Sequence, residues 1–416
     1  MINKEKLFNT WHTLHSFVHD TRLHHFANGF PKTYFFAVCL AALLGYGFLL
    51  MFPLLVIVAV TQLWGVAQTV PFTVDSLSQG LVWFAVLIFC TAICHHIFTV
   101  KFEPPKGIGL PAAKTPALFE LINDNKGTSF WSRLFWPKFN NVLLSEQFVL
   151  EIHKTPVTGI PLWSKNTLVI GFPLMQTMPQ HYFDCTLVRK IVQYSKGRNL
   201  VTNFLYQLRD IWFLYPQAFS QRKLLGEQVI VWFFRWYAPF YSKLSLYLAQ
   251  QEELAADRLA LREINDIDLF KSIESQAIAQ NFFHKIYLPL LYDFIRNKGA
   301  NTAQLNPYTT LPNVYRKAAT EERCKQWIEG FQKSALNTRS PSPTLSQRMG
   351  NIGHSRIRLP QLGGTSAAEH YFAAHYPMAA QLLDNVWRNK THRQLKRRRK
   401  SASHTTPGLH IKAAVS

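Results

Sequence analysis

Residues 33–66 read TYFFAVCLAALLGYGFLLMFPLLVIVAVTQLWGV, an apolar run without a single charged side chain. A helix needs about 20 apolar residues to cross the hydrocarbon core of a bilayer. This run is long enough to span with tilt, but too short for two spans and a turn. Pro53 lies inside it, which membrane helices tolerate. The sequence therefore predicts a transmembrane helix over residues 33–66, and the alternative is a buried core helix.

A second apolar run, LVWFAVLIFCTAICHHIFTV, covers residues 81–100 and is also of spanning length. The segment at 67–80 has no Lys or Arg, whereas lysines precede the first run and follow the second. Because Lys and Arg favour the cytoplasmic side, we expect a cytoplasmic segment at 1–32, an external loop at 67–80 and both termini in the cytoplasm. The expected location is the inner (cytoplasmic) membrane, crossed twice.

The chain is strongly basic, with a formal net charge of +21, and its basic residues are densest near the C-terminus. Residues 388–416 are expected to form a disordered tail that contacts the anionic lipids of the nearby bilayer. Nucleic acid is the alternative partner, although the sequence contains no nucleic-acid-binding motif. The tail residues expected at the membrane surface are Lys396, Arg397, Arg398, Arg399 and Lys400.

Residues 101–387 are expected to form a cytoplasmic domain that is mainly helical with a small β-sheet (α+β). Strands are predicted at 141–150 (NVLLSEQFVL) and at 167–172 (TLVIGF). Helices are predicted over residues 180–208, 227–248 and 250–263. The last of these has apolar residues at helical spacing with charged residues between them, which is typical of an amphipathic helix.

Several pieces of this domain occur in a recognisable order. The strand-like segment NTLVIGFPLMQTM is followed by a helix, then by Glu253-Leu-Ala-Ala-Asp257 and Arg258, and finally by SPTLSQRMGNIG, which contains Arg348. This order resembles the membrane-bound zinc metallopeptidases of the HtpX-like and CAAX-prenyl-endopeptidase group. In that group the corresponding motifs are HExxH, ExxxD-R and HPSxxxR. The resemblance covers roughly residues 101–387 and implies a zincin-like domain behind two N-terminal spans.

The zinc-binding residues of that group are missing from this chain. HExxH holds zinc with two His side chains at i and i+4, and its Glu activates the bound water. Aligning that helix with MPQHYFDCTLVRKIVQYSKG puts Arg189 and Gln193 at the His positions and Lys190 at the Glu position. Arg cannot ligate zinc because it has no lone pair to offer and stays protonated. Glu253 remains as the one ligand-like residue and Asp257 as its supporting carboxylate, so no metal is expected unless this alignment is wrong.

Two smaller departures concern the substrate side of the resemblance. The Asn-Ala pair that the group carries on its edge strand is replaced by Val149 and Leu150. The His-Pro pair near the C-terminus is replaced by Ser342 and Pro343.

The substitutions also suggest what replaced the metal. Without zinc, a buried Glu253 would keep an uncompensated charge, which costs several kcal/mol. We therefore predict that Arg189 forms an ion pair with Glu253 between the two helices, and that Lys190 pairs with Glu252 or Asp257. The alternative is that the residues at the motif positions are surface residues of an unrelated helix.

A second candidate metal site lies at the N-terminus. His12, His15 and His19 share one face of a possible helix. Such a face could hold a metal, although an amphipathic helix on the membrane is the more usual meaning of this pattern.

The favoured function is a catalytically inactive metallopeptidase-like protein, a pseudopeptidase with a binding or regulatory role. Its expected partners are the bilayer and either an unfolded or membrane protein client or an active relative. The alternatives are an active zinc endopeptidase with unrecognised ligands and an unrelated membrane-tethered scaffold. The absence of HExxH argues against the first alternative. The sequence also contains no GxSxG motif and no phosphate-binding loop, so no other catalytic device is evident.

Overall fold

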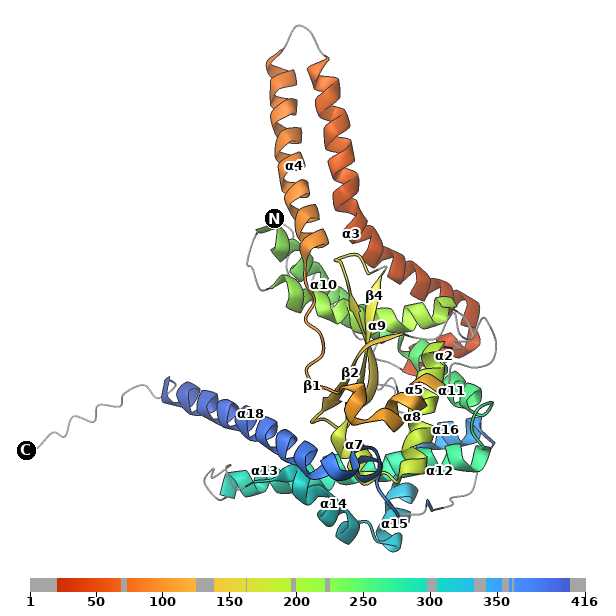
Figure 1. The fold of residues 1–416 in the computed structure, drawn as a ribbon. Helices are drawn as coiled ribbons and strands as arrows, with labels where there is room; N and C mark the ends of the chain where they lie inside the picture. Colours follow the sequence, from red (N-terminus) through yellow and green to blue (C-terminus); the bar gives the residue numbers. More distant parts are fainter. Residues whose placement is uncertain are drawn as a thin grey trace, which may run out of the picture.

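The computed structural model shows a mostly helical chain with a small sheet and a long helical hairpin that projects from it (Figure 1). The hairpin consists of α3 (Pro31–Ala67) and α4 (Val74–Thr99), and the short helix α2 (Thr21–Gly29) precedes it. The structure describes residues 21–68, 73–124, 138–161, 163–195, 200–220, 225–297, 305–332, 342–353, 359–360 and 363–404.

Both hairpin helices are long and apolar enough to cross a membrane, which is consistent with membrane association. Only 22% of the most apolar stretch of α3 and 17% of that of α4 are buried, so most of their side chains face outward. α4 begins at Val74 rather than at 81, so half of the loop predicted at 67–80 is helical. Thr73 caps this end, because its hydroxyl accepts a hydrogen bond from the Ser76 amide at 3.2 Å.

The sheet has four strands in the order β1-β2-β4-β3, with β1 and β3 at its edges. β2 and β4 are parallel, and the other two pairs are antiparallel. β4 is central, so its apolar residues are buried on both faces. The bounds are Ile108–Gly109 for β1, Phe139–Ser145 for β2, Leu150–Pro156 for β3 and Ser164–Gly171 for β4.

The predicted strand at 167–172 is confirmed over residues 167–171 as the end of β4, and the strand predicted at 141–150 is confirmed only over residues 141–145. That segment contains the end of β2, a turn and the first residue of β3. The Ser145 hydroxyl accepts a hydrogen bond from the Gln147 amide at 3.2 Å, which stabilises the turn. The turn also packs tightly on β4, because a Cβ on Gly171 would lie 2.2 Å from the Gln147 carbonyl oxygen.

Helices surround the sheet and form three apolar clusters with it. Their bounds, with those of the short turns, are a 3-10 turn at Ala112–Lys114, α5 (Pro116–Asp124), α7 (Phe172–Thr177), α8 (Gln180–Ser195), α9 (Leu200–Phe219), α10 (Leu225–Leu244), α11 (Leu246–Ala260), α12 (Asp266–Asn281), a π-helical turn (Phe282–Tyr287), α13 (Leu288–Asn297), α14 (Pro307–Ala318), α15 (Glu321–Gln332), α16 (Leu345–Asn351), α17 (Ala367–Phe372), a 3-10 turn at Ala373–His375 and α18 (Tyr376–His404).

The first apolar cluster joins the base of the hairpin to α9 and α10. The second joins the sheet to α8 and α18, and the third surrounds α12.

Two helix boundaries differ from the prediction. The helix expected over 180–208 is two helices, α8 and α9, and the chain between them contains Gly197 and Asn199, residues typical of helix ends. The break expected near residue 249 falls at Ser245, which precedes α11. Its hydroxyl bonds back to the Tyr241 carbonyl at 2.6 Å.

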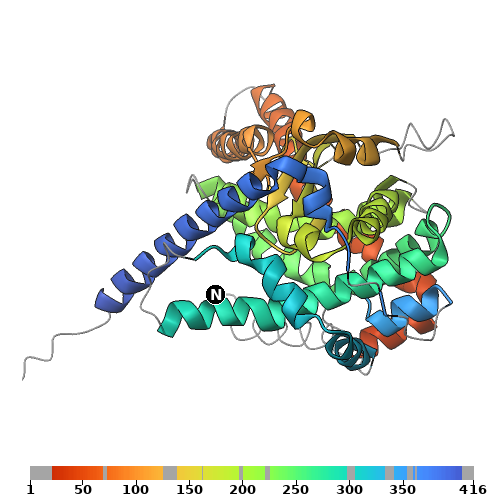
Figure 2. The same cartoon turned by 60° about the horizontal axis from the view of Figure 1, so that its bottom comes forward.

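The tail also differs from its prediction as a disordered segment over 388–416. α18 continues as a helix to His404 and extends beyond the rest of the molecule in both views (Figures 1 and 2). Residues 396–400 therefore belong to this helix, while residues 405–416 lie outside the described part of the chain.

Candidate functional site

Helices α8 and α11 pack side by side and bring the residues at the motif positions together. Arg189 and Gln193 lie one helical turn apart on the buried face of α8. Glu253 and Asp257 lie one turn apart on the buried face of α11. The alternative interpretation requires these residues to lie on an exposed helix surface, but Arg189 and Gln193 are buried.

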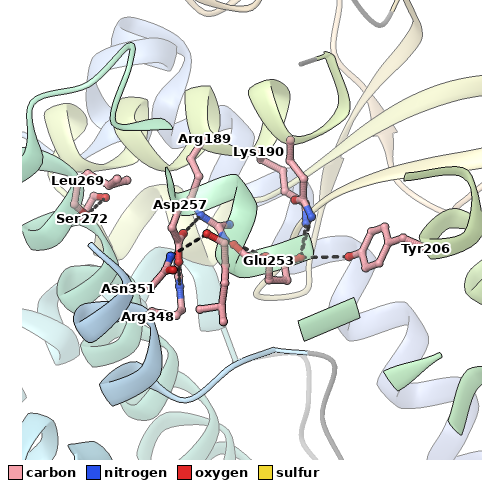
Figure 3. Close-up of polar contacts among 11 residues, drawn as sticks. Arg189, Lys190, Tyr206, Glu253, Asp257, Leu269, Ser272, Arg348 and Asn351 are labelled. Atoms are coloured by element: carbon pink, nitrogen blue, oxygen red, sulfur yellow. Dashed lines mark hydrogen bonds and ion pairs between the residues drawn. The ribbon is translucent and has the colours of Figure 1, made fainter. Parts of the chain in front are cut away.

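The predicted ion pair between Arg189 and Glu253 is confirmed (Figure 3). One terminal nitrogen of Arg189 lies 2.8 Å from Oε2 of Glu253 and also donates to the Glu253 backbone carbonyl at 3.1 Å. The Nε of Arg189 donates to Oδ1 of Asp257. Arg189 is 6% exposed, Glu253 9% and Asp257 0%, so the protein shields most of these charged groups from bulk water.

The second oxygen of Glu253 has partners of its own. Oε1 accepts hydrogen bonds from Nε2 of Gln193 at 3.1 Å and from the hydroxyl of Tyr206 on α9 at 3.0 Å. Lys190 Nζ lies 3.5 Å from the same oxygen. The prediction that Lys190 pairs with Glu252 or Asp257 is wrong, because its ammonium group pairs with Glu253. Tyr206 was not predicted, and no sequence signal connects it to this site.

Asp257 is shared with Arg348, the residue that the resemblance identified near the C-terminus. Arg348 Nε donates to Oδ2 at 2.9 Å and its terminal nitrogen donates to Oδ1 at 2.8 Å. This two-pronged contact is the strongest geometry for an Arg–carboxylate pair. On the same short helix, α16, Asn351 Nδ2 donates to the Leu254 carbonyl at 2.7 Å. The network therefore joins α8, α11 and α16.

The charges of this network stabilise one another. Burial alone would raise the pKa of the Glu253 carboxyl, but the charges of Lys190 and Arg189 outweigh it and hold that pKa well below its usual range. Burial likewise opposes the charged form of Asp257, and Arg189 and Arg348 together lower its pKa. Burial acts to lower the pKa of Arg189, but the two carboxylates outweigh it and raise that pKa above its ordinary value. Arg189, Glu253 and Asp257 are therefore ionised at neutral pH.

This arrangement does not fit a zinc ion. A zinc site needs three or four lone-pair donors around one point, but the Arg189 guanidinium lies between the two carboxylates that could supply them. Both oxygens of Glu253 already accept hydrogen bonds. In the described ranges, no group of three or more His, Cys, Asp or Glu side chains could hold a metal ion.

A groove of about 820 Å³ opens beside the network. Its walls are the start of β3, the helices α8 and α12, and the segment that leads into α16. The network faces it through Lys190, Glu253 and Arg348. The four positions at which the resemblance implied substrate-side residues also line it, namely Val149, Leu150, Ser342 and Pro343.

The structure describes only some of the N-terminal histidines. His12, His15 and His19, the candidate second metal site, lie outside the described residues. His24 instead connects α2 to α11, with Nε2 at 2.9 Å from the Gln250 side-chain oxygen.

No protein-family model matches the chain, and comparison with curated proteins and with solved structures found no match.

Proposed function

We propose that this chain is a membrane-anchored, catalytically inactive relative of the HtpX-like and CAAX-prenyl metallopeptidases, which binds an extended polypeptide segment. Its domain is then zincin-like, with α8 as the former HExxH helix and α11 as the former ExxxD helix. The hairpin α3–α4 crosses the membrane twice and leaves both termini in the cytoplasm.

The observation that supports this proposal most is the position of the Arg189 guanidinium. It joins α8 to α11 through Glu253 and Asp257, the same pair of helices that zinc joins in the active group. A guanidinium between two buried carboxylates supplies the positive charge that the metal would otherwise supply, without a Lewis acid to activate water. Peptide hydrolysis by the zinc mechanism is therefore lost, while the fold is retained.

The groove supports a binding role. β3 is an edge strand, and among the described strands it pairs only with β4, so its other edge offers backbone groups to an incoming extended chain. The groove begins beside the first residues of β3, Leu150 and Glu151. Further along β3, the Tyr194 hydroxyl donates a hydrogen bond to the Ile152 carbonyl at 3.1 Å. That carbonyl is therefore not free for an added strand, so strand addition is limited to the end of β3 nearest the groove.

The structural part of the proposal is tested by rebuilding the motif. The triple variant Arg189→His, Lys190→Glu and Gln193→His restores HExxH on α8 opposite Glu253. We expect it to bind about one zinc per chain, since three ligands then face one point. Wild-type protein and the variant Arg189→His alone serve as controls and should bind none. A triple variant that is folded but binds no zinc would refute the assignment of α8 and α11.

The binding part is tested separately with fluorescein-labelled reduced casein as an unfolded probe, read by fluorescence anisotropy. Ala277 lines the groove, so Ala277→Trp fills it, whereas Ala113 is exposed outside the groove and Ala113→Trp is the matched control. We expect Ala277→Trp to weaken binding by at least about tenfold, or 1.4 kcal/mol. Equal affinities for both variants, or no binding by wild type, would refute the polypeptide-binding role.

A further inference from the structure

Helix α10 carries an exposed aromatic stripe that the packing of the domain does not explain. One face of α10 is buried against α9 and the hairpin, through residues such as Phe234 and Tyr237. The opposite face exposes Trp232 at 68% and Trp236 at 36%, with exposed Arg235 between them. Exposed indole rings are unfavourable in water, but tryptophans with a neighbouring cation are typical of helices that lie in a membrane interface.

Close contacts fix the position of α10 along the two hairpin helices. The Phe48 ring of α3 stacks on Phe233 with centroids 3.8 Å apart, and Phe233 in turn contacts Trp236 at 5.4 Å. At the other hairpin helix, a Cβ on Gly226 would lie 2.7 Å from Ile93. The exposed stripe of α10 is therefore continuous with the surface of the hairpin at the level of Phe48 and Ile93.

The part of the hairpin beyond this level has the length of a bilayer core. A helix rises 1.5 Å per residue, so α3 from Phe48 to Ala67 and α4 from Val74 to Ile93 each extend about 28 Å beyond α10. The hydrocarbon core of a bilayer is about 30 Å thick. These arms carry one charged residue, Asp75, in the first turn of α4. α4 begins at the end of the hairpin that lies away from the domain (Figure 1). Both arms thus independently give the same position for the membrane boundary, which coincides with α10.

The far end of the hairpin has the matching feature. Trp64 is 70% exposed and lies one turn from the end of α3, where the opposite membrane boundary falls. Tryptophan is enriched at both boundaries of membrane proteins because its ring is apolar and its N–H seeks a polar partner.

From these observations we propose that α10 lies in the membrane interface on the domain side. Trp232 and Trp236 insert at the boundary between headgroups and acyl chains, and Arg235 contacts headgroup phosphates. The bilayer then stabilises the domain through a second contact, since it fixes the position of α10 and, through it, of α9, which packs on α10. The proposal rests on the membrane anchoring by the hairpin and adds a lipid contact that the two spans alone do not require.

The test uses the full chain in phosphatidylcholine vesicles. An environment-sensitive fluorescent amino acid replaces one residue at a time, so that the native cysteines stay in place. The three positions are Trp232 on the proposed interface, Ile57 within the expected span, and Arg258, an exposed residue of α11. Each labelled protein is studied in two separate quenching experiments. One uses lipids brominated on the acyl chain, which quench a label inside the bilayer, and the other uses iodide, which quenches a label in water.

We expect brominated lipid to quench the fluorescence at positions 57 and 232, while position 258 responds only to iodide. If position 57 responds to lipid but position 232 behaves like 258, the interfacial helix is refuted and the anchor stands. If positions 57 and 232 both respond only to iodide, the membrane anchor itself is refuted, and the interfacial helix with it.

Discussion

Replacing Arg189 by Ala removes the central cation of the buried network. Arg189 contacts Glu253 at 2.8 Å and also contacts Asp257, and both carboxylates are at least nine-tenths buried. Removing one partner of a buried ion pair costs about 3–5 kcal/mol, because the remaining charge stays out of water without compensation. Lys190 and Arg348 still neutralise part of that charge, so we expect a loss near the lower end of this range.

The loss can be measured as a change in melting temperature. For a domain of this size, each kcal/mol corresponds to about 2–4 °C, so a loss of about 3 kcal/mol should make Arg189→Ala melt roughly 6–12 °C below wild type. The readout is the intrinsic tryptophan fluorescence of detergent-purified protein during heating. Arg258→Ala is the matched control, since Arg258 is an exposed arginine of α11, and its effect should stay within about 0.5 kcal/mol.

A double-mutant cycle identifies the cause of the loss. Glu253→Gln removes one of the charges that Arg189 compensates, so the double variant should lose less than the two single variants together. For groups in direct contact we expect a coupling of about 1–3 kcal/mol. The reasoning would be refuted if Arg189→Ala melted like Arg258→Ala, or if the two single losses were simply additive.

Three further predictions follow from the contacts. Because the network lowers the pKa of both buried carboxyls, its stabilisation is complete above their ordinary pKa values of about 4 and is lost as pH falls through the lowered ones; the melting temperatures of wild type and Arg189→Ala should therefore begin to converge below about pH 5. Gly45→Ala should cost about 1–3 kcal/mol, because its Cβ would lie 2.8 Å from the Tyr237 hydroxyl. Gly47→Ala in the same helix has no atom within 4 Å of its Cβ and should not lower the melting temperature. Arg348→Ala should cost about 1.5–3 kcal/mol and increase amide exchange in α16, since its two bonds to Asp257 connect that helix to α11.

The parts of the fold that could be predicted from sequence are those encoded locally. The run at 33–66 has no charge and predicts a long apolar helix from composition alone, and α3 follows it closely. The turn after Ser145 was missed and the break at Ser245 was placed about four residues too late, because a hydroxyl-to-backbone bond decides each boundary. The tail was predicted to be disordered from its charge, but Lys and Arg are good helix formers, and α18 is held to the domain through buried Trp387.

The candidate site divides in the same way. The pair between Arg189 and Glu253 could be predicted because one position offered a cation where another kept a carboxylate. The contact of Tyr206 with Glu253 depends on how α9 returns across the domain, and no local pattern encodes that path. The interaction of Lys190 with Glu253 depends on the direction of one long side chain, which helical spacing does not determine.

Zinc content tests the central claim most directly, that an arginine–carboxylate network joins α8 to α11 in the place where the proposed relatives would hold a metal. The measurement is zinc per mole of the wild-type protein, purified in detergent with a non-chelating tag and analysed by elemental mass spectrometry. We predict a value well below one zinc per chain, unchanged after dialysis against zinc. A value close to one would contradict the claim, because the metal would require lone pairs that Arg189 and its hydrogen bonds now exclude.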